Sequence, residues 1–495
     1  MKPNKKLLRT LVWTLLACLL VSCAPAMAEE EPLVVTMYLG CGVVEFPPDG
    51  NEIEKMIEDY TGVDMRINAY SGTVLHEMMP TLIAGGDLPM VVNVGGSQLS
   101  KSYLINAMRA GEFWDVTDYI YGLDNFKDIN PLALENYAID GRLYGLPLER
   151  GLSRDALTYR YDWLQNLGME EPTTVDELVD MWLAFTKNDP DGEDDTYGVV
   201  TSGLTFVNQL AVHLGAPNNW KYQDGEMIKM QLTDAYMEAL DISRMLYEEG
   251  AVHPEFAIRE RADYEGDFID GKAGSYYDVS TGISVFQSQM VDEEAVLHAS
   301  NLFAAPDGNY YTSAGRGNNG ILLFSKKAIP DKETLDKVIN IFDRLADEEM
   351  CNLLALGVEG INYEVVDGVA QPIPENDAYW QEKINSPYSV PLAVRWPNLR
   401  TMPVNYDYGD QRNLEIIREN DPYGVADDSL GLINELYNDL GGDLDTLMND
   451  ACTLYVMGEI DKAEFQNRME QWRAQGGDDI AAEYARLYEE KNNIQ

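Results

Sequence analysis

Apolar residues in the first part of the chain form short runs that alternate with helical patterns. Residues 33–39 are an apolar run of the length of a buried strand, and residues 53–60 place their apolar side chains on one helix face. Strand-like runs follow at 64–69 and at 90–94, the second after a Gly- and Pro-containing turn. The order strand, helix, strand, helix, strand predicts an α/β domain with a mostly parallel sheet.

Longer amphipathic helices are predicted downstream. Thr174 and Glu177 have capping-box spacing just before a helix pattern, and residues 335–345 show a second apolar helix face. Residues 465–487 predict C-terminal helices that are interrupted at Gly476 and Gly477. Because the chain has neither a fixed-period repeat nor a low-complexity linker, we expect interleaved domains.

The first residues have the pattern of an export signal. Four basic residues precede the apolar run 11–21, which is too short to span a bilayer comfortably. The sequence ending in Cys23 favours lipidation of that cysteine and a signal peptide of residues 1–22. The alternative is cleavage after Ala28, with Cys23 discarded and the protein secreted. Both alternatives predict an extracytoplasmic protein.

Composition narrows the class of partner. The chain has 495 residues, 45% of them hydrophobic, which supports packed cores in two or three domains. Its formal charge of -48 argues against nucleic acid and anionic membranes as partners, and it favours neutral or cationic ligands over polyanions. The acidity can also serve only to keep an exposed protein soluble.

Motifs that resemble catalytic or nucleotide sites lack the required context. His76 begins an H-E-x-x pattern, but Pro80 stands where the second zinc-binding histidine is needed. Residues 315–320 match G-x-G-x-x-G, yet a strand-like run follows where a dinucleotide site needs a helix. The cysteines Cys41, Cys351 and Cys452 show no metal or disulfide spacing, so we expect buried thiols.

One acidic segment has the composition of a calcium loop. Oxygen ligands alternate through it, with a glycine between them, at Asp189, Asp191, Glu193 and Asp195. The alternative interpretation is a solvated acidic turn between two elements. No other cofactor is predicted.

Several short sequence segments, in their order along the chain, resemble those of the extracellular solute-binding proteins of sugar ABC transporters, family 1. The resemblance is strongest to the long lipoprotein branch related to alginate-binding proteins. The resemblance extends over roughly residues 32–490. The stretches that carry it are AGGDLP at 84–89, FWDVTDY at 113–119, DGRLYGLP at 140–147, YRYDWL at 159–164, PTTVDEL at 172–178, PEF at 254–256, GKAG at 271–274 and the terminal helix after Gly476-Gly477.

The resemblance implies a two-lobed, periplasmic-binding-protein-like α/β fold of type II, with hinge crossovers and extra C-terminal helices. Lobe 1 would comprise residues 32–147 and 317–394, and lobe 2 residues 148–316 and 395–495. The lobes would close over a ligand by hinge motion.

Sugars are bound by flat aromatic rings and by charged or amide groups at the ring edge. Candidate ligand-binding residues therefore lie in predicted loops near strand ends or at the glycine-rich crossover, although each also has an ordinary structural interpretation. They are Tyr38, Trp220, Tyr276, Tyr277, Arg316, Arg395 and Trp396.

The resulting hypothesis is a monomeric, non-catalytic binding protein that delivers a carbohydrate, such as an oligosaccharide, to a separate ABC permease. The second hypothesis is a secreted carbohydrate-active enzyme, such as a glycoside hydrolase or lyase. The third is a surface lipoprotein with a structural or sensory role. Product release separates the enzyme from the binding protein, and a ligand-dependent thermal shift separates the binding protein from the structural protein.

Overall fold

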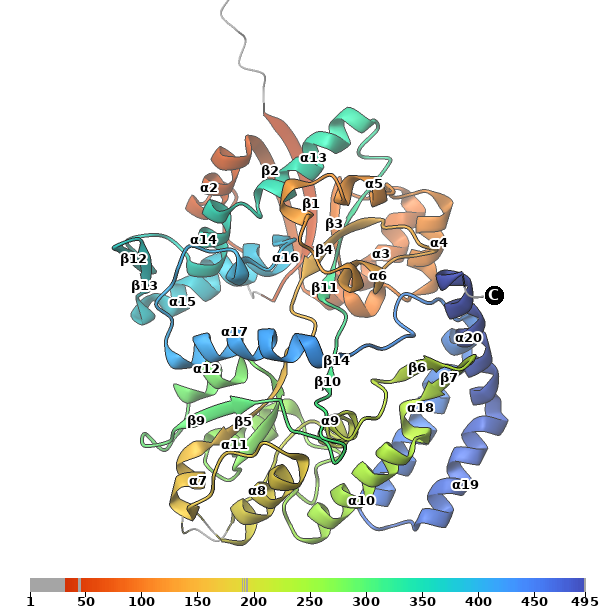
Figure 1. The fold of residues 1–495 in the computed structure, drawn as a ribbon. Helices are drawn as coiled ribbons and strands as arrows, with labels where there is room; N and C mark the ends of the chain where they lie inside the picture. Colours follow the sequence, from red (N-terminus) through yellow and green to blue (C-terminus); the bar gives the residue numbers. More distant parts are fainter. Residues whose placement is uncertain (1–31, 43–45, 189, 191, 193–194, 494–495) are drawn as a thin grey trace, which may run out of the picture.

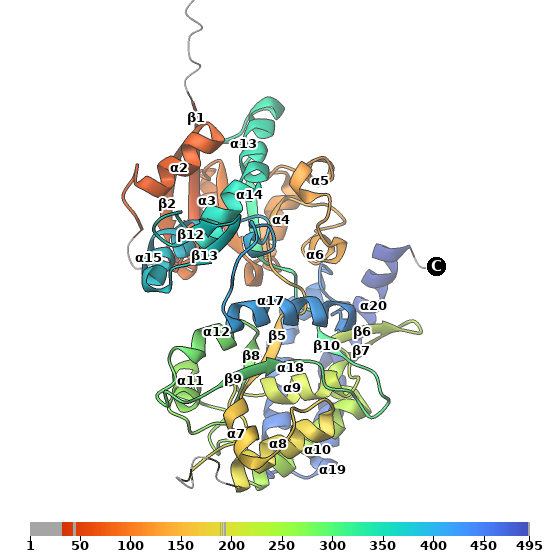
Figure 2. The ribbon, with the colours of Figure 1, turned by 60° about the vertical axis from the view of Figure 1, so that its left-hand side comes forward.

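The computed structural model describes residues 32–42, 46–188, 190, 192 and 195–493. They form two α/β lobes joined by several chain segments (Figures 1 and 2). The predicted leader with Cys23 lies outside the described residues, and so do Asp189, Asp191 and Glu193. Within the described part, no helix has the length and apolar character needed to cross a membrane.

Lobe 1 is built on a five-stranded sheet whose order differs from the order of the strands in the chain. β1 pairs in parallel with β2 and β3, whereas β11 is antiparallel to both of its neighbours, β3 and β4. The strands, in spatial order, are β2 (Val63–Tyr70), β1 (Leu33–Gly40), β3 (Val91–Gly95), β11 (Asn318–Phe324) and β4 (Gly145–Glu149). The three strands predicted at the start of the chain are confirmed.

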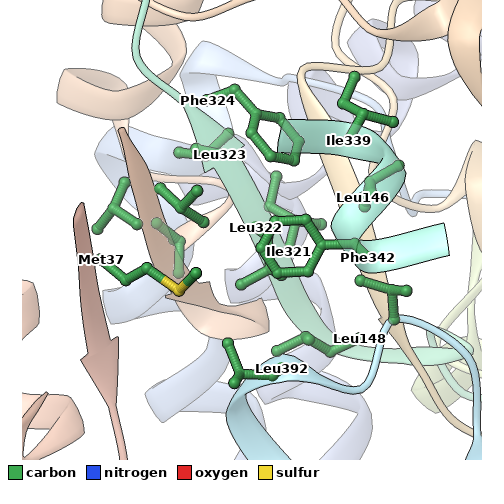
Figure 3. Packing of buried hydrophobic residues seen from close by; sticks show 14 of the residues in the cluster. Met37, Leu146, Leu148, Ile321, Leu322, Leu323, Phe324, Ile339, Phe342 and Leu392 are labelled. Carbon is green, nitrogen blue, oxygen red and sulfur yellow. The ribbon is translucent and has the colours of Figure 1, made fainter. Parts of the chain in front are cut away.

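Helices and a small hairpin complete lobe 1. Its helices are α2 (Glu52–Thr61), α3 (Gly72–Gly85), α4 (Ser102–Ala110), α5 (Thr117–Ile120), α6 (Pro131–Glu135), α13 (Lys332–Arg344), α14 (Glu348–Leu356), α15 (Asp377–Trp380), the π-helix η5 (Gln381–Ser389) and α16 (Val390–Leu392). The hairpin consists of β12 (Tyr363–Val366) and β13 (Val369–Pro372). Figure 3 shows how β1, β4, β11 and α13 share one apolar core, although these elements lie far apart in the chain.

Lobe 2 contains a three-stranded antiparallel sheet covered by helices. The strands, in spatial order, are β8 (Ser275–Val279), β5 (Asp155–Arg160) and β9 (Leu297–Ser300). The helices of its first part are α7 (Tyr161–Leu167), α8 (Val175–Lys187), α9 (Thr205–His213), α10 (Asp234–Glu248), α11 (Arg261–Ile269) and α12 (Gly282–Gln287). A hairpin of β6 (Trp220–Gln223) and β7 (Glu226–Lys229) lies between α9 and α10 in sequence.

The end of the chain forms the predicted C-terminal helices, which pack on lobe 2. Its helices are α17 (Tyr408–Asn420), α18 (Glu435–Val456), α19 (Lys462–Trp472) and α20 (Asp478–Asn492). Gly476 interrupts the helical path between α19 and α20 with a φ of 118°, a conformation that favours glycine. Residues of α18 to α20 belong to the same buried cluster as α8 and α10.

Local sequence signals explain several of these elements. α8 begins with the predicted capping box, in which Thr174 accepts from the Glu177 N–H and Glu177 accepts from the Thr174 N–H. Leu178, Trp182 and Phe185 form its buried face. Phe185 packs so closely on the chain before β8 that a Cβ on Gly274 would lie 2.1 Å from its ring, so this contact requires glycine.

Three segments cross between the lobes. The first links β4 to β5, the second links β10 (Thr312–Ser313) to β11, and the third, residues 395–407, leads to α17. The first two run side by side, since the Arg150 N–H donates to the Gly317 carbonyl at 2.9 Å and the Gly315 N–H to the Leu152 carbonyl at 2.8 Å. The residue boundaries given above for the lobes remain predictions.

Candidate binding site between the lobes

The sheets of both lobes end at the crossovers. In lobe 1, Gly320 in the first half of β11 lies opposite Gly95 at the end of β3, so the carboxyl ends of the parallel strands β1, β2 and β3 lie at this edge. In lobe 2, Asp155 at the start of β5 pairs with Val279 at the end of β8. Ligands of open α/β sheets bind outside the carboxyl ends of strands, which makes the region between the lobes the candidate site.

A cavity of about 150 Å³ lies in this region and is lined by both lobes and by the second crossover. We call it the Arg316 cavity. Its side chains are mainly aromatic, aliphatic and amide. Its lining includes Asn136 of lobe 1, Arg316 of the second crossover, and Trp220, Asp427, Tyr437 and Tyr484 of lobe 2.

Arg316 reaches this cavity from the second crossover, whose glycines allow it to pack closely against lobe 1. Gly317 has a φ of +74°, and a Cβ there would clash with Ala133 at 2.7 Å. The Arg316 side chain passes Gly96, where a Cβ would lie 3.6 Å from its Cδ. Within the described part of the chain, its half-buried guanidinium makes no hydrogen bond or ion pair. Its hydrogen-bonding capacity is therefore available to a ligand.

Asn136 holds the crossover in place. Its side-chain amide donates to the carbonyl oxygens of Gly315 at 3.4 Å and Arg316 at 3.2 Å. On the other side, the Asn218 amide donates to the Ala314 carbonyl at 2.8 Å. Neither asparagine was a candidate from sequence, because their partners are 179 and 96 residues away and no local motif marks them.

Trp220 borders the Arg316 cavity but is only 1% exposed. Its ring packs against Tyr484, with centroids 5.3 Å apart, and the Lys229 ammonium lies 4.9 Å from the ring centroid. Burial lowers the pKa of Lys229. Trp220 thus forms a wall of the cavity and at the same time anchors the β6–β7 hairpin to the C-terminal helices.

Asp427 is the second charged residue of the cavity, and its oxygens already have partners. It accepts hydrogen bonds from the backbone N–H and hydroxyl of Ser429 and from the side-chain amide of Asn219. Burial raises its pKa. The guanidinium of Arg316 is consequently the charged group with unused hydrogen-bonding capacity at this cavity.

Arg395 and Trp396 line a different cavity of about 300 Å³ beside the crossovers. Arg395 is 5% exposed; it donates to Glu149 at 2.7 Å and to Asp128 at 2.8 Å. The Trp396 N–H also donates to Glu149, at 2.9 Å. Both residues therefore tie the third crossover to the first, and their roles in ligand binding remain predictions.

Tyr276 and Tyr277 lie inside β8 rather than in a loop, because the turn ends at Gly274. The Tyr276 hydroxyl donates to Asp278 at 2.9 Å, and the Tyr277 hydroxyl lies 2.6 Å from His213 Nε2. Burial lowers the pKa of His213 to about 4, so this imidazole is neutral at physiological pH. Both tyrosines are buried away from the Arg316 cavity.

Tyr38 lies in the second half of β1 and is half-buried. Its ring packs edge-on against Tyr70, at the end of β2, with centroids 5.4 Å apart. Tyr70 was not a sequence candidate; its place at a strand end becomes informative only once the β1–β2 register is known. This aromatic pair belongs to the edge of lobe 1 that faces the crossovers.

The prediction of buried thiols is tested by the structure, whereas the prediction of a calcium loop falls largely outside the described residues. Cys41, Cys351 and Cys452 are buried, as predicted, and burial raises the pKa of Cys351 and Cys452 to about 12. Of the four calcium candidates, Asp195 alone lies in the described part, where no group of three or more His, Cys, Asp or Glu side chains could hold a metal. The calcium loop remains a prediction.

The sequence model of the bacterial extracellular solute-binding proteins matches residues 46–331. The chain belongs to this family. It is 28% identical to the polygalacturonan/rhamnogalacturonan-binding protein YtcQ of Bacillus subtilis over 477 residues, 95% of this chain and 94% of YtcQ.

Solved structures share the two-lobed fold. The alginate-binding protein AlgQ2 superposes with a TM-score of 0.65 at 16% identity, covering 93% of this chain and 98% of AlgQ2. The ABC-transporter substrate-binding protein FusA of Streptococcus pneumoniae, solved with kestose, superposes with a TM-score of 0.62 at 18% identity, covering 93% of this chain and all of FusA. The fold predicted from the resemblance is confirmed.

Proposed function

We propose that this solute-binding protein captures an oligosaccharide between its lobes and delivers it to an ABC permease. The observation that carries the proposal is the Arg316 cavity, where both lobes and a crossover place aromatic, amide and guanidinium groups around one space. These groups suit the apolar faces and hydroxyl rims of sugar rings. The similarity to YtcQ, named for a polysaccharide ligand, and to FusA, solved with kestose, supports the proposal.

Ligand binding is expected to stabilise the protein without turnover. At a hundredfold excess over Kd, one bound ligand contributes about 2.7 kcal/mol to the free energy of unfolding, so the melting temperature rises by several degrees. A thermal-shift screen against an oligosaccharide library measures this, and chromatography of the same samples detects any product. New reducing ends or unsaturated products would favour the enzyme hypothesis. An unshifted melting temperature across the library would favour the structural lipoprotein.

We also propose that Cys23 carries a lipid that anchors the protein outside the cytoplasm. The apolar run followed by Leu20-Val21-Ser22-Cys23 supports this cleavage site over the one after Ala28. Cys23→Ala is expected to move the protein from the membrane fraction to the medium, which immunoblotting of both fractions measures. A wild-type protein whose mature N-terminus is Glu29 would contradict the anchor.

A further inference from the structure

The first two crossovers carry arginines that form no ion pair within the described part of the chain. Thirteen of the eighteen arginines in the described part form an ion pair with a carboxylate. The five without one are Arg150, Arg154, Arg316, Arg344 and Arg418. Three of these five lie on the first two crossovers, in a chain whose acidic residues number 84 against 36 basic ones.

These crossover arginines lie close together along the backbone. The crossover segment with Arg150 and the crossover segment with Arg316 are hydrogen-bonded on both sides of Arg316, through Gly317 and Gly315. Burial and the positive charge of Arg154 lower the pKa of Arg150 to about 10, although the neighbouring Glu149 carboxylate acts in the opposite direction. Arg150 lines the cavity of Arg395 and Trp396 together with the carboxylates of Asp128, Glu149 and Asp421, so its charge is partly compensated there.

Arg316 is the member of this group that reaches the cavity between the lobes. The other charged residue of that cavity, Asp427, is engaged by Ser429 and Asn219. A planar guanidinium can bind a carboxylate through two parallel hydrogen bonds, which a hydroxyl group cannot match. The half-buried Tyr437 offers aromatic surface on the lobe 2 side.

We propose that the oligosaccharide is acidic and that Arg316 binds one of its sugar carboxylates. This inference rests on the proposed function and specifies its substrate class. For this site it reverses the expectation from net charge, which favoured neutral or cationic ligands. At physiological ionic strength charges are screened over about 8 Å, so the groups that touch the ligand outweigh the distant surface acids.

The test compares ligands that differ only in charge. Trigalacturonate and trimannuronate are titrated into the protein by calorimetry, each beside its carboxyl-reduced form, in which every carboxylate is a hydroxymethyl group. Wild type is expected to bind at least one acidic trimer about 10–100-fold more tightly than its reduced form. Arg316→Gln is expected to remove most of this preference, and Arg316→Lys to keep part of it.

Arg418→Gln is the matched control: it removes an unpaired arginine of α17, outside the cavity, and is expected to keep the preference.

The outcomes separate this inference from the proposed function. Equal binding of the acidic and reduced trimers would overturn the inference and leave oligosaccharide capture intact. Equal losses for both forms in Arg316→Gln would also overturn it, since they would assign Arg316 a structural role. A preference for a sulfated galactan trimer over both uronates would overturn the carboxylate assignment. Absence of binding to any carbohydrate in the wider library would overturn both proposals.

Discussion

Trp396→Ala is expected to lower the free energy of unfolding of the unliganded protein by about 3–5 kcal/mol, the usual cost of truncating a buried tryptophan. Trp396 is 9% exposed and packs with Leu414 and Ile417 of α17. A Cβ on Gly151 would lie 3.2 Å from its Cζ3, so the ring rests directly on the first crossover. Denaturant unfolding followed by circular dichroism measures the change.

Leu399→Ala is the matched control for this variant. Leu399 lies on the same crossover but is 45% exposed, so its truncation is expected to change stability by about 0.5 kcal/mol or less. Unchanged apo stability in Trp396→Ala, together with weaker ligand binding, would contradict the structural role. It would instead place Trp396 on the ligand, as its occurrence in a predicted loop suggested.

Arg395→Met is expected to cost about 3–5 kcal/mol, because it leaves the carboxylate of Glu149, 15% exposed, without its ion-pair partner. Adding Glu149→Gln removes the unpaired charge and should restore part of the loss. The four proteins of this double-mutant cycle, compared by denaturant unfolding, measure the coupling.

Arg66→Met is the control for a surface ion pair. Arg66 pairs with Asp49 and Asp64 on lobe 1 with half of its side chain exposed, and its loss is expected to cost less than about 1 kcal/mol. Strictly additive effects of Arg395→Met and Glu149→Gln would show that the pair does not hold the crossovers together.

The features that could be predicted from the sequence are those whose signals are local. The three early strands show as apolar runs, and the start of α8 follows from Thr174 and Glu177, three residues apart. The strand-like run after the glycines around Arg316 argued against a nucleotide loop, and β11 confirms that strand. In each case the deciding residues are neighbours in the chain.

The candidate site was less predictable because its contacts join distant segments. Arg395 and Glu149 are 246 residues apart, and nothing beside Arg395 indicates that its charge is already paired. Trp396 was predicted to lie in a loop, and no residue beside it in the chain indicates that Leu414 and Ile417 of α17 pack on its ring. Tyr276 and Tyr277 were predicted to lie in a loop after Gly274, yet β8 begins at Ser275 and contains both.

Strand β11 lies between β3 and β4 in the sheet of lobe 1, yet it begins only at Asn318, whereas β4 ends at Glu149. Because the ribosome synthesises the chain from its N-terminus, β1 to β4 are made long before β11, the strand that pairs with both β3 and β4. All three strands of the lobe 2 sheet are complete by Ser300, ahead of β11. Since non-local strand pairing is slow, the edges of β3 and β4 stay open during synthesis until the chain has passed through lobe 2. The lobe that starts first is thus the one whose sheet is finished last.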